Sequence, residues 1–93
     1  MENGTYLKLA SGELTPITAT TGYWVAIEPK MPHDIFEGQY LGVWTDDKDG
    51  KEYYDRSVFI SDLDDALAVA KQHDQIAIWD NANRCEIYVD YSV

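Results

Sequence analysis

One segment alone carries a helical pattern of apolar residues, and this limits the folds open to the chain. Within residues 61–73 the apolar residues recur at spacings of three and four: Leu63, Ala66, Leu67 and Ala70. Such spacing places them on one face of a helix. The other apolar segments are short and rich in β-branched and aromatic residues, as strands are. This pattern predicts an α+β domain with one mainly antiparallel sheet of four to six strands and the helix packed on one face.

The helix is predicted to span residues 61–73, and its ends are marked by charge. Ser61 is placed to cap the N-terminus, with Asp64 completing a capping box three positions later. Acidic residues crowd the first turn and basic residues the last, as the helix dipole favours. These residues are Asp62, Asp64, Asp65, Lys71 and His73.

The strands are predicted from side-chain alternation and from the residues that interrupt it. The clearest ranges are 22–28, 40–45, 53–60, 76–80 and 84–91. Residues 5–10 and 13–18 could form a further hairpin, in which Pro16 favours a sheet edge because it has no N–H to donate. Two prolines make residues 29–38 a loop, and Asp-Gly marks a turn at residues 46–52.

Alternation along the strands separates two sets of side chains. An aliphatic set is predicted to form the core beneath the helix: Val25, Ile27, Leu41, Val43, Val58, Ile60, Ile76, Ile78, Cys85, Ile87 and Val89. The opposite set is aromatic and mixed: Trp24, Tyr40, Trp44, Tyr53, Phe59, Trp79 and Tyr88. One helix cannot cover both faces. The N-terminal hairpin covers the aromatic face, or the sheet curls into a small barrel, or the aromatic residues remain exposed and bind a partner.

Composition narrows the class of protein. The chain has 93 residues, which predicts a single domain over residues 1–93. Seventeen acidic and seven basic residues give a net charge of −10. Direct binding to nucleic acid or to an anionic membrane needs positive charge, so neither is expected. The single cysteine and the lack of a signal-peptide pattern predict a cytoplasmic protein.

No pattern predicts a catalytic residue, a cofactor or a metal site. Residues 46–50 match part of a calcium loop, but its first position would be Thr45 and its twelfth Arg56. An EF-hand needs acidic ligands at both positions, so a simple turn is predicted. Cys85 alternates with Ile87, which predicts a buried structural thiol rather than a nucleophile.

Two features of the charged residues suggest interactions. Arg56 is predicted to be partly buried and paired with Asp55, Asp80 or Glu28. Residues 46–65 contain eight acidic and three basic residues, and therefore half of the net charge. Either these acids form a solvated surface, or they steer the chain toward a basic partner. The residues predicted to bind such a partner are Asp46, Asp47, Asp49, Glu52, Asp62, Asp64 and Asp65, with Trp44 as an aromatic anchor.

Several runs from Tyr40 onward resemble a group of small proteins of bacteriophages, prophages and some bacteria. The runs are residues 41–46 (LGVWTD), 54–58 (YDRSV), 62–67 (DL..AL) and 75–80 (QIAIWD), and the part of the chain from Tyr40 onward that contains them is a little over half of it. The resemblance implies an accessory protein of a mobile element and carries no known activity with it. Acidic phage proteins of this size include inhibitors of host restriction and CRISPR systems, a similarity of size and charge alone.

These observations favour a non-enzymatic binding protein. The preferred hypothesis is an inhibitor that blocks a basic nucleic-acid-binding enzyme, with carboxylates in place of phosphates. Duplex DNA carries one charge per about 1.7 Å, so ten charges correspond to roughly 17 Å of helix. The alternatives are an accessory domain or homodimer that uses its aromatic face, an immunity protein that neutralises a basic toxin, and an enzyme with a perturbed carboxylate or His33 in a pocket.

Overall fold

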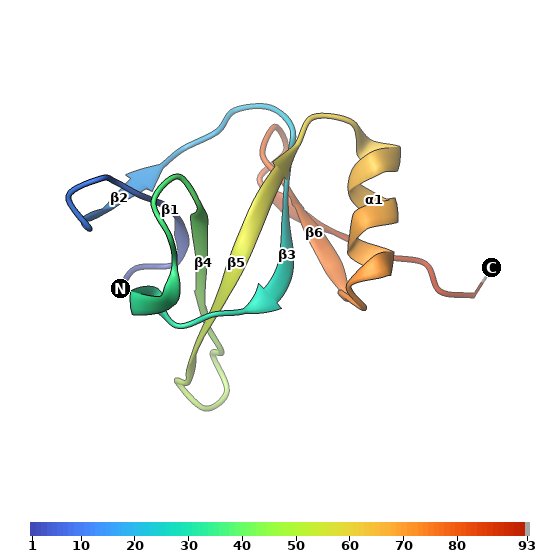
Figure 1. The fold of residues 1–93 in the computed structure, drawn as a ribbon. Coiled ribbons are helices and arrows are strands. Elements are labelled where there is room, and N and C mark those ends of the chain that lie inside the picture. Colours follow the sequence, from blue (N-terminus) through green and yellow to red (C-terminus); the bar gives the residue numbers. More distant parts are fainter. Residues whose placement is uncertain (93) are drawn as a thin grey trace. The chain divides into compact units, whose positions relative to one another are not determined.

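The computed structural model describes residues 1–92 and contains one antiparallel sheet with a single helix (Figure 1). The sheet has seven strands in the order β2-β1-β4-β5-β3-β6-β7. The strands are β1 (Gly4–Lys8), β2 (Leu14–Ile17), β3 (Tyr23–Pro29), β4 (Tyr40–Thr45), β5 (Glu52–Ile60), β6 (Ala77–Asp80) and β7 (Cys85–Tyr88). The helix α1 is Leu63–Gln72, and a short 3-10 helix covers Pro32–Asp34. The α+β class is confirmed.

The strand count is higher than predicted because the N-terminal hairpin joins the sheet. β1 pairs with β2 on one side and with β4 on the other, and both pairs are antiparallel. β2 is a terminal strand of the sheet and contains Pro16. A proline is tolerated there because an edge strand does not need every N–H group for the ladder. The predicted edge position of this strand is therefore confirmed.

The residues of the chain form two compact units, each with its own internal contacts. The first unit contains Met1–Thr18 and Glu28–Ser57, and the second contains Ala19–Ile27 with the described residues from Val58 onward. Strands β3 and β5 each contribute residues to both units. The predicted single aliphatic core is wrong in this respect, because the buried residues form two separate clusters.

The core of the first unit is built from strands β1 and β4 and the loop after β3. Leu41 and Val43 are buried in it with Tyr6 and Ile35. Leu41 is completely inaccessible to solvent. Tyr6 lies directly opposite Leu41 in the β1–β4 register, which brings their side chains to the same face.

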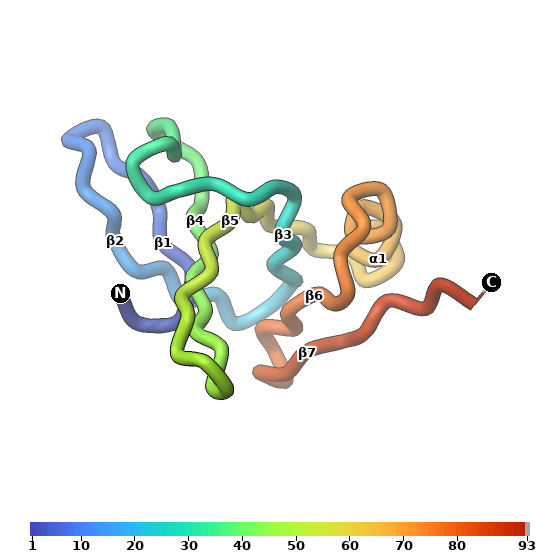
Figure 2. The backbone as a smooth tube through the Cα atoms, turned by 90° about the horizontal axis from the view of Figure 1, so that it is seen from below, coloured from blue at the N-terminus to red at the C-terminus, as the bar shows by residue number. Residues whose placement is uncertain are grey.

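The core of the second unit lies between the helix and the strands beside it. Ala66 and Ala70 of α1 are fully buried against Val25 and Ile78. These two alanines belong to the predicted apolar stripe, whereas Leu63 at its start is exposed. Figures 1 and 2 show α1 beside β6, with β7 next to β6.

In residues 1–92 no helix is long and apolar enough to cross a membrane.

Three details of the predicted elements are wrong. Asp62 rather than Ser61 caps the helix, and its carboxylate accepts a hydrogen bond from the Asp65 N–H at 3.0 Å. Ile76 precedes β6 and is 74% exposed rather than buried. Cys85 is exposed rather than buried, and it lies opposite Asp80 at the turn end of the β6–β7 hairpin. Alternation predicts which side of the strand a residue occupies, but not whether another element covers that side.

Candidate partner-binding site

Two exposed aromatic rings stack at the end of the β4–β5 hairpin. The register pairs Trp44 directly with Tyr53. Their ring centroids are 4.9 Å apart with an interplanar angle of 18°. Trp44 is 49% and Tyr53 38% exposed. The two rings therefore form a small, preformed apolar platform that remains accessible to solvent.

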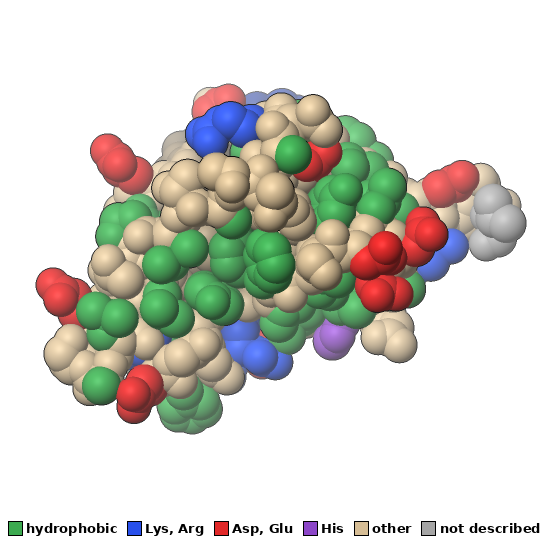
Figure 3. Space-filling view, turned by 90° about the horizontal axis from the view of Figure 1, so that it is seen from above, with side chains coloured by type: hydrophobic (Ala, Val, Ile, Leu, Met, Phe, Trp, Pro, Cys, Tyr) green, Lys and Arg blue, Asp and Glu red, His purple; other side chains and the backbone are tan. Residues whose placement is uncertain are grey.

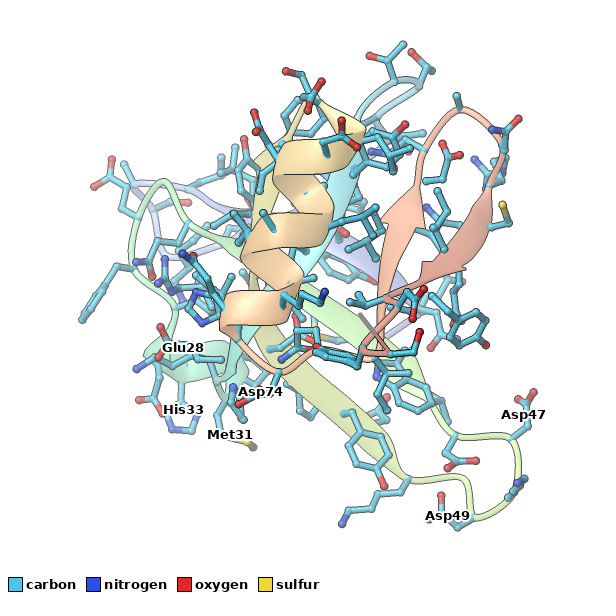
Figure 4. All side chains as sticks on the ribbon, turned by 90° about the vertical axis from the view of Figure 1, so that its right-hand side faces the viewer. Glu28, Met31, His33, Asp47, Asp49 and Asp74 are labelled. Carbon is cyan, nitrogen blue, oxygen red and sulfur yellow. The ribbon has the colours of Figure 1, made fainter. Side chains whose placement is uncertain are left out.

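Carboxylates order the turn beyond the aromatic rings. The Asp46 side chain accepts a hydrogen bond from the Lys48 N–H at 2.8 Å, and the Asp49 side chain accepts one from the Lys51 N–H at 2.8 Å. Gly50 has a φ of 68°, a left-handed conformation that glycine adopts without steric cost. Asp47 projects outward from the tip of the hairpin, whereas Asp49 lies at the tip with its carboxylate turned back to the backbone (Figure 4). Two aspartate side chains thus bond to the backbone of the turn, and Asp47 is exposed at its surface.

Glu52 follows the turn and connects it to the N-terminus. Its carboxylate accepts hydrogen bonds from the Tyr54 hydroxyl and from the N-terminal amino group, the latter at 3.1 Å. Both hydrogen bonds lower the pKa of Glu52, and the bond from Tyr54 has the larger effect. The same bond raises the pKa of Tyr54. Glu52 is therefore ionised at neutral pH and carries part of the negative charge of this hairpin.

A depression of about 400 Å³ adjoins the aromatic pair. Tyr53, Tyr54, Pro29 and Met31 line it together with four charged side chains. Figure 4 shows Met31 and His33 near the 3-10 helix in the loop that follows β3. Lys51 lies 5.4 Å from the centre of the Tyr53 ring, in the range of a cation–π contact. The platform thus continues into a partly apolar recess of the same unit.

The seven predicted acidic residues fall into two groups. Asp46, Asp47, Asp49 and Glu52 belong to the first unit together with Trp44. Asp62, Asp64 and Asp65 begin helix α1 in the second unit, where Asp62 serves as the cap. Every residue of the second group is exposed. The structure thus brings four of the predicted acids together with the predicted aromatic anchor. Tyr53 was missed as a site residue, although the hairpin register could have paired it with Trp44.

Arg56 is half-buried and pairs with Glu28, one of the three predicted partners. The Arg56 Nε atom donates a hydrogen bond to Glu28 at 2.9 Å, and Lys30 lies 3.7 Å from the same carboxylate. The hydrogen bond from Arg56 lowers the pKa of Glu28. This pair links the end of strand β3 to strand β5, which makes it a structural salt bridge.

Asp55 is a half-buried carboxylate in the middle of strand β5. It lies opposite Gly42 in the β4–β5 register and accepts a hydrogen bond from the Ser57 hydroxyl at 2.7 Å. Burial raises the pKa of Asp55, and the hydrogen bond from Ser57 only partly opposes this effect. Burial disfavours the charged form of a carboxyl group that has no cationic partner.

The raised pKa of Asp55 leads to a prediction about stability and pH. Because the pKa is higher in the folded state than in the unfolded state, ionisation of Asp55 destabilises the fold as the pH rises through the folded-state value. Asp55→Asn keeps an acceptor for Ser57 but cannot ionise. We expect this variant to have a higher Tm than the wild type at pH 7 and a similar Tm near pH 3. Thermal unfolding across this range, with the exposed-site variant Asp47→Asn as control, measures the effect. A lower Tm at pH 7 for Asp55→Asn would contradict it.

Several aromatic residues lie on the face of the second unit opposite the helix. Trp24 is paired with Trp79 in the β3–β6 register, and its ring meets Phe59 edge-on at 5.5 Å. Trp24 is buried, whereas Phe59, Trp79 and Tyr88 are exposed. More generally, hydrophobic side chains reach the surface at many places (Figure 3). Most of the predicted aromatic set (Trp24, Tyr40, Trp44, Tyr53, Phe59, Trp79 and Tyr88) is therefore exposed to solvent, which was one of the three predicted arrangements.

Asp80, one of the predicted partners of Arg56, instead bonds to the turn between β6 and β7. It is buried and accepts hydrogen bonds from the Ala82 N–H and from the backbone and side chain of Asn83. The side-chain bond from Asn83 contributes most to lowering the pKa of Asp80.

Within residues 1–92, no three His, Cys, Asp or Glu residues gather as metal ligands would. No known protein family, curated protein or solved structure matches the chain.

Proposed function

We propose that the protein binds a basic protein partner through the end of the β4–β5 hairpin. The observation that carries this proposal is the exposed Trp44–Tyr53 stack next to four carboxylates. The partner class that fits best is an enzyme with a positively charged nucleic-acid groove. The protein would occupy that groove and act as an inhibitor.

The aromatic pair supplies the apolar part of such an interface. Tryptophan and tyrosine are enriched among the residues that dominate binding energy. Stacking holds the two rings in place before binding, so less side-chain entropy is lost on association. In a nucleic-acid groove, aromatic rings can also take the positions of stacked bases.

The carboxylates supply the electrostatic part. Asp46 and Asp49 are held by bonds to the turn backbone, and the hydrogen bonds to Glu52 keep it ionised. Fixed carboxylates present negative charge at defined positions, as phosphates do along a strand. With a net charge of −10, the field of the whole chain also attracts a basic partner over distance. Such attraction raises association rates and weakens with salt.

Competition with DNA tests the proposal directly. The immobilised chain is exposed to a panel of purified nucleic-acid enzymes with basic grooves, and retained proteins are challenged with a short DNA duplex. We expect at least one enzyme to be retained at low salt and released by the duplex. A variant with Asp46→Asn, Asp47→Asn and Asp49→Asn keeps the acceptor oxygens of the turn but removes three charges. It should bind at least tenfold more weakly, with a shallower salt dependence.

A matched variant separates local from global charge effects. Asp62→Asn, Asp64→Asn and Asp65→Asn also remove three charges, but in the second unit. If the hairpin binds the partner, this control should lose much less affinity than the hairpin variant. Trp44→Ala should weaken binding at low and high salt alike. Equal losses in the two triple variants would overturn the assignment to the hairpin, and retention unaffected by DNA would overturn groove binding.

A further inference from the structure

The recess beside the Trp44–Tyr53 pair already holds a positive charge that belongs to the chain itself. Lys51 lines this recess, and its ammonium group lies 5.4 Å from the centre of the Tyr53 ring. A cation at this distance over an aromatic face is attracted by the ring quadrupole. Lys51 is exposed, and its flexible four-carbon stem allows the ammonium group to move into solvent. The recess is therefore a cation site whose present occupant can be replaced.

The Tyr53 ring turns its free face toward the recess. Trp44 stacks on the other face, with ring centroids 4.9 Å apart, and is not among the described residues that line the recess. Tyr54 and Met31 add apolar surface, and Figure 4 shows Met31 in the loop that follows β3. At about 400 Å³ the recess lies at the small end of ligand-binding pockets. It therefore suits one side chain rather than a longer segment.

The charges around the recess favour a new cation once Lys51 has left. The charged side chains that line it balance one another: Lys30, Lys51, Asp34 and Glu52. The Lys30 ammonium group is paired with the Glu28 carboxylate at 3.7 Å. In the part of the chain that the structure describes, Asp34 pairs only with His33, at 3.6 Å, and His33 carries charge only when it is protonated. Displacing the Lys51 ammonium group leaves one carboxylate charge uncompensated, which an incoming cation restores.

We propose that this recess binds the guanidinium group of an arginine side chain of the protein partner, which takes the place of Lys51. The inference rests on the proposed function, because that function requires a partner with a basic groove. A guanidinium group is planar, stacks on aromatic faces and bonds to carboxylates through several N–H groups, whereas an ammonium group is compact and strongly hydrated. A recess with an aromatic wall and two carboxylates therefore fits arginine better than lysine.

A small probe tests the recess without the partner. Nα-acetyl-arginine methylamide is titrated into the isotope-labelled full chain at about 0.15 M salt, where exposed charges more than about 8 Å apart are largely screened. We expect saturable amide shifts in the NMR spectrum at Met31, Asp34, Lys51 and Tyr53, with weak affinity because the probe is small. The citrulline analogue has nearly the same shape without the charge and should not bind. Equal binding by the citrulline or the lysine analogue would overturn the assignment to arginine.

Lys51→Met provides the sharpest result, because it removes the competing cation and keeps an unbranched apolar side chain. We expect this variant to bind the arginine probe about two- to fivefold more tightly, the factor that corresponds to one cation–π contact at an exposed site. Lys48→Met removes the same charge from the same turn, but Lys48 is not among the described residues that line the recess. This control should change the affinity much less. Equal gains in the two variants would overturn the replacement of Lys51.

Tyr53→Leu tests the aromatic wall and should weaken probe binding about two- to fivefold. Asp34→Asn should weaken it as well, and circular dichroism verifies that both variants are folded. Unchanged affinity in both variants would overturn the proposal. The variant with Asp46→Asn, Asp47→Asn and Asp49→Asn should bind the probe normally, since none of these three lines the recess in the described chain. An enzyme retained by the chain without binding of the arginine probe overturns the recess alone, whereas probe binding without a retained enzyme supports the recess and counts against the proposed function.

Discussion

Leu41→Ala is expected to lower the free energy of unfolding by about 2–5 kcal/mol, the range for leucine truncation in a packed core. Leu41 is completely buried in the cluster of the first unit, against Tyr6, Ile35 and Val43. Removing its side chain leaves a cavity that strands β1 and β4 cannot close without breaking their pairing. For a domain whose total stability is of order 5–15 kcal/mol, this is a large fraction.

The matched control is Leu63→Ala at the start of helix α1. Leu63 is 38% exposed, so the same truncation removes less buried surface and leaves no enclosed cavity, and it should cost less than Leu41→Ala. Urea unfolding followed by tryptophan fluorescence measures both variants. Similar costs for the two would contradict the burial of Leu41. Hydrogen exchange adds a further test, because equal loss of protection in both clusters of Leu41→Ala would indicate that the two units unfold together.

The sequence predicted the type and order of the elements because local signals were strong. The strand at Tyr40–Thr45 has the predicted bounds, since glycine, proline and aspartate interrupt the chain on both sides of it. The helix is found within one or two residues at each end. The cap was assigned to Ser61 instead of Asp62 because both residues have suitable acceptor oxygens. A one-residue shift of this kind depends on backbone geometry, which composition does not encode.

The division of the core could not be predicted from alternation. Alternation says which side of a strand a residue occupies, but not how much of that side another element covers. The helix has ten residues, and the buried residues clustered with it all belong to the second unit. Val25 and Ile78 are buried with the helix residues Ala66 and Ala70, whereas Cys85 is exposed. The stacking of Trp44 on Tyr53 likewise depends on the hairpin register, which follows from the length of the turn.

The second large effect is expected at Gly42, where alanine should destabilise the fold. Gly42 lies in the middle of β4, where replacing glycine usually stabilises a strand by about 0.5–1 kcal/mol. Here an added Cβ would lie 2.5 Å from the Asp55 Oδ1 atom and 2.8 Å from the Ser57 Oγ atom. Overpacking of this kind costs about 1–3 kcal/mol. Displacing the Asp55 carboxylate also breaks its bond to Ser57, at a further cost of about 1 kcal/mol. The steric and hydrogen-bond terms therefore outweigh the intrinsic gain.

The same contacts define the control for Gly42→Ala. Removing the Asp55 carboxylate creates space for the added methyl group, so Gly42→Ala should cost less in an Asp55→Ala background than in the wild type. Thermal unfolding of the four proteins in this double-mutant cycle measures the coupling, which we expect to be about 1 kcal/mol or more for side chains in direct contact. Each 1 kcal/mol corresponds to about 4–8 °C in Tm for a domain of this size, so the difference is easily resolved. Additive effects would show that the new methyl group meets something other than Asp55, and a stabilising Gly42→Ala would show that β4 and β5 do not approach each other as closely as their register requires.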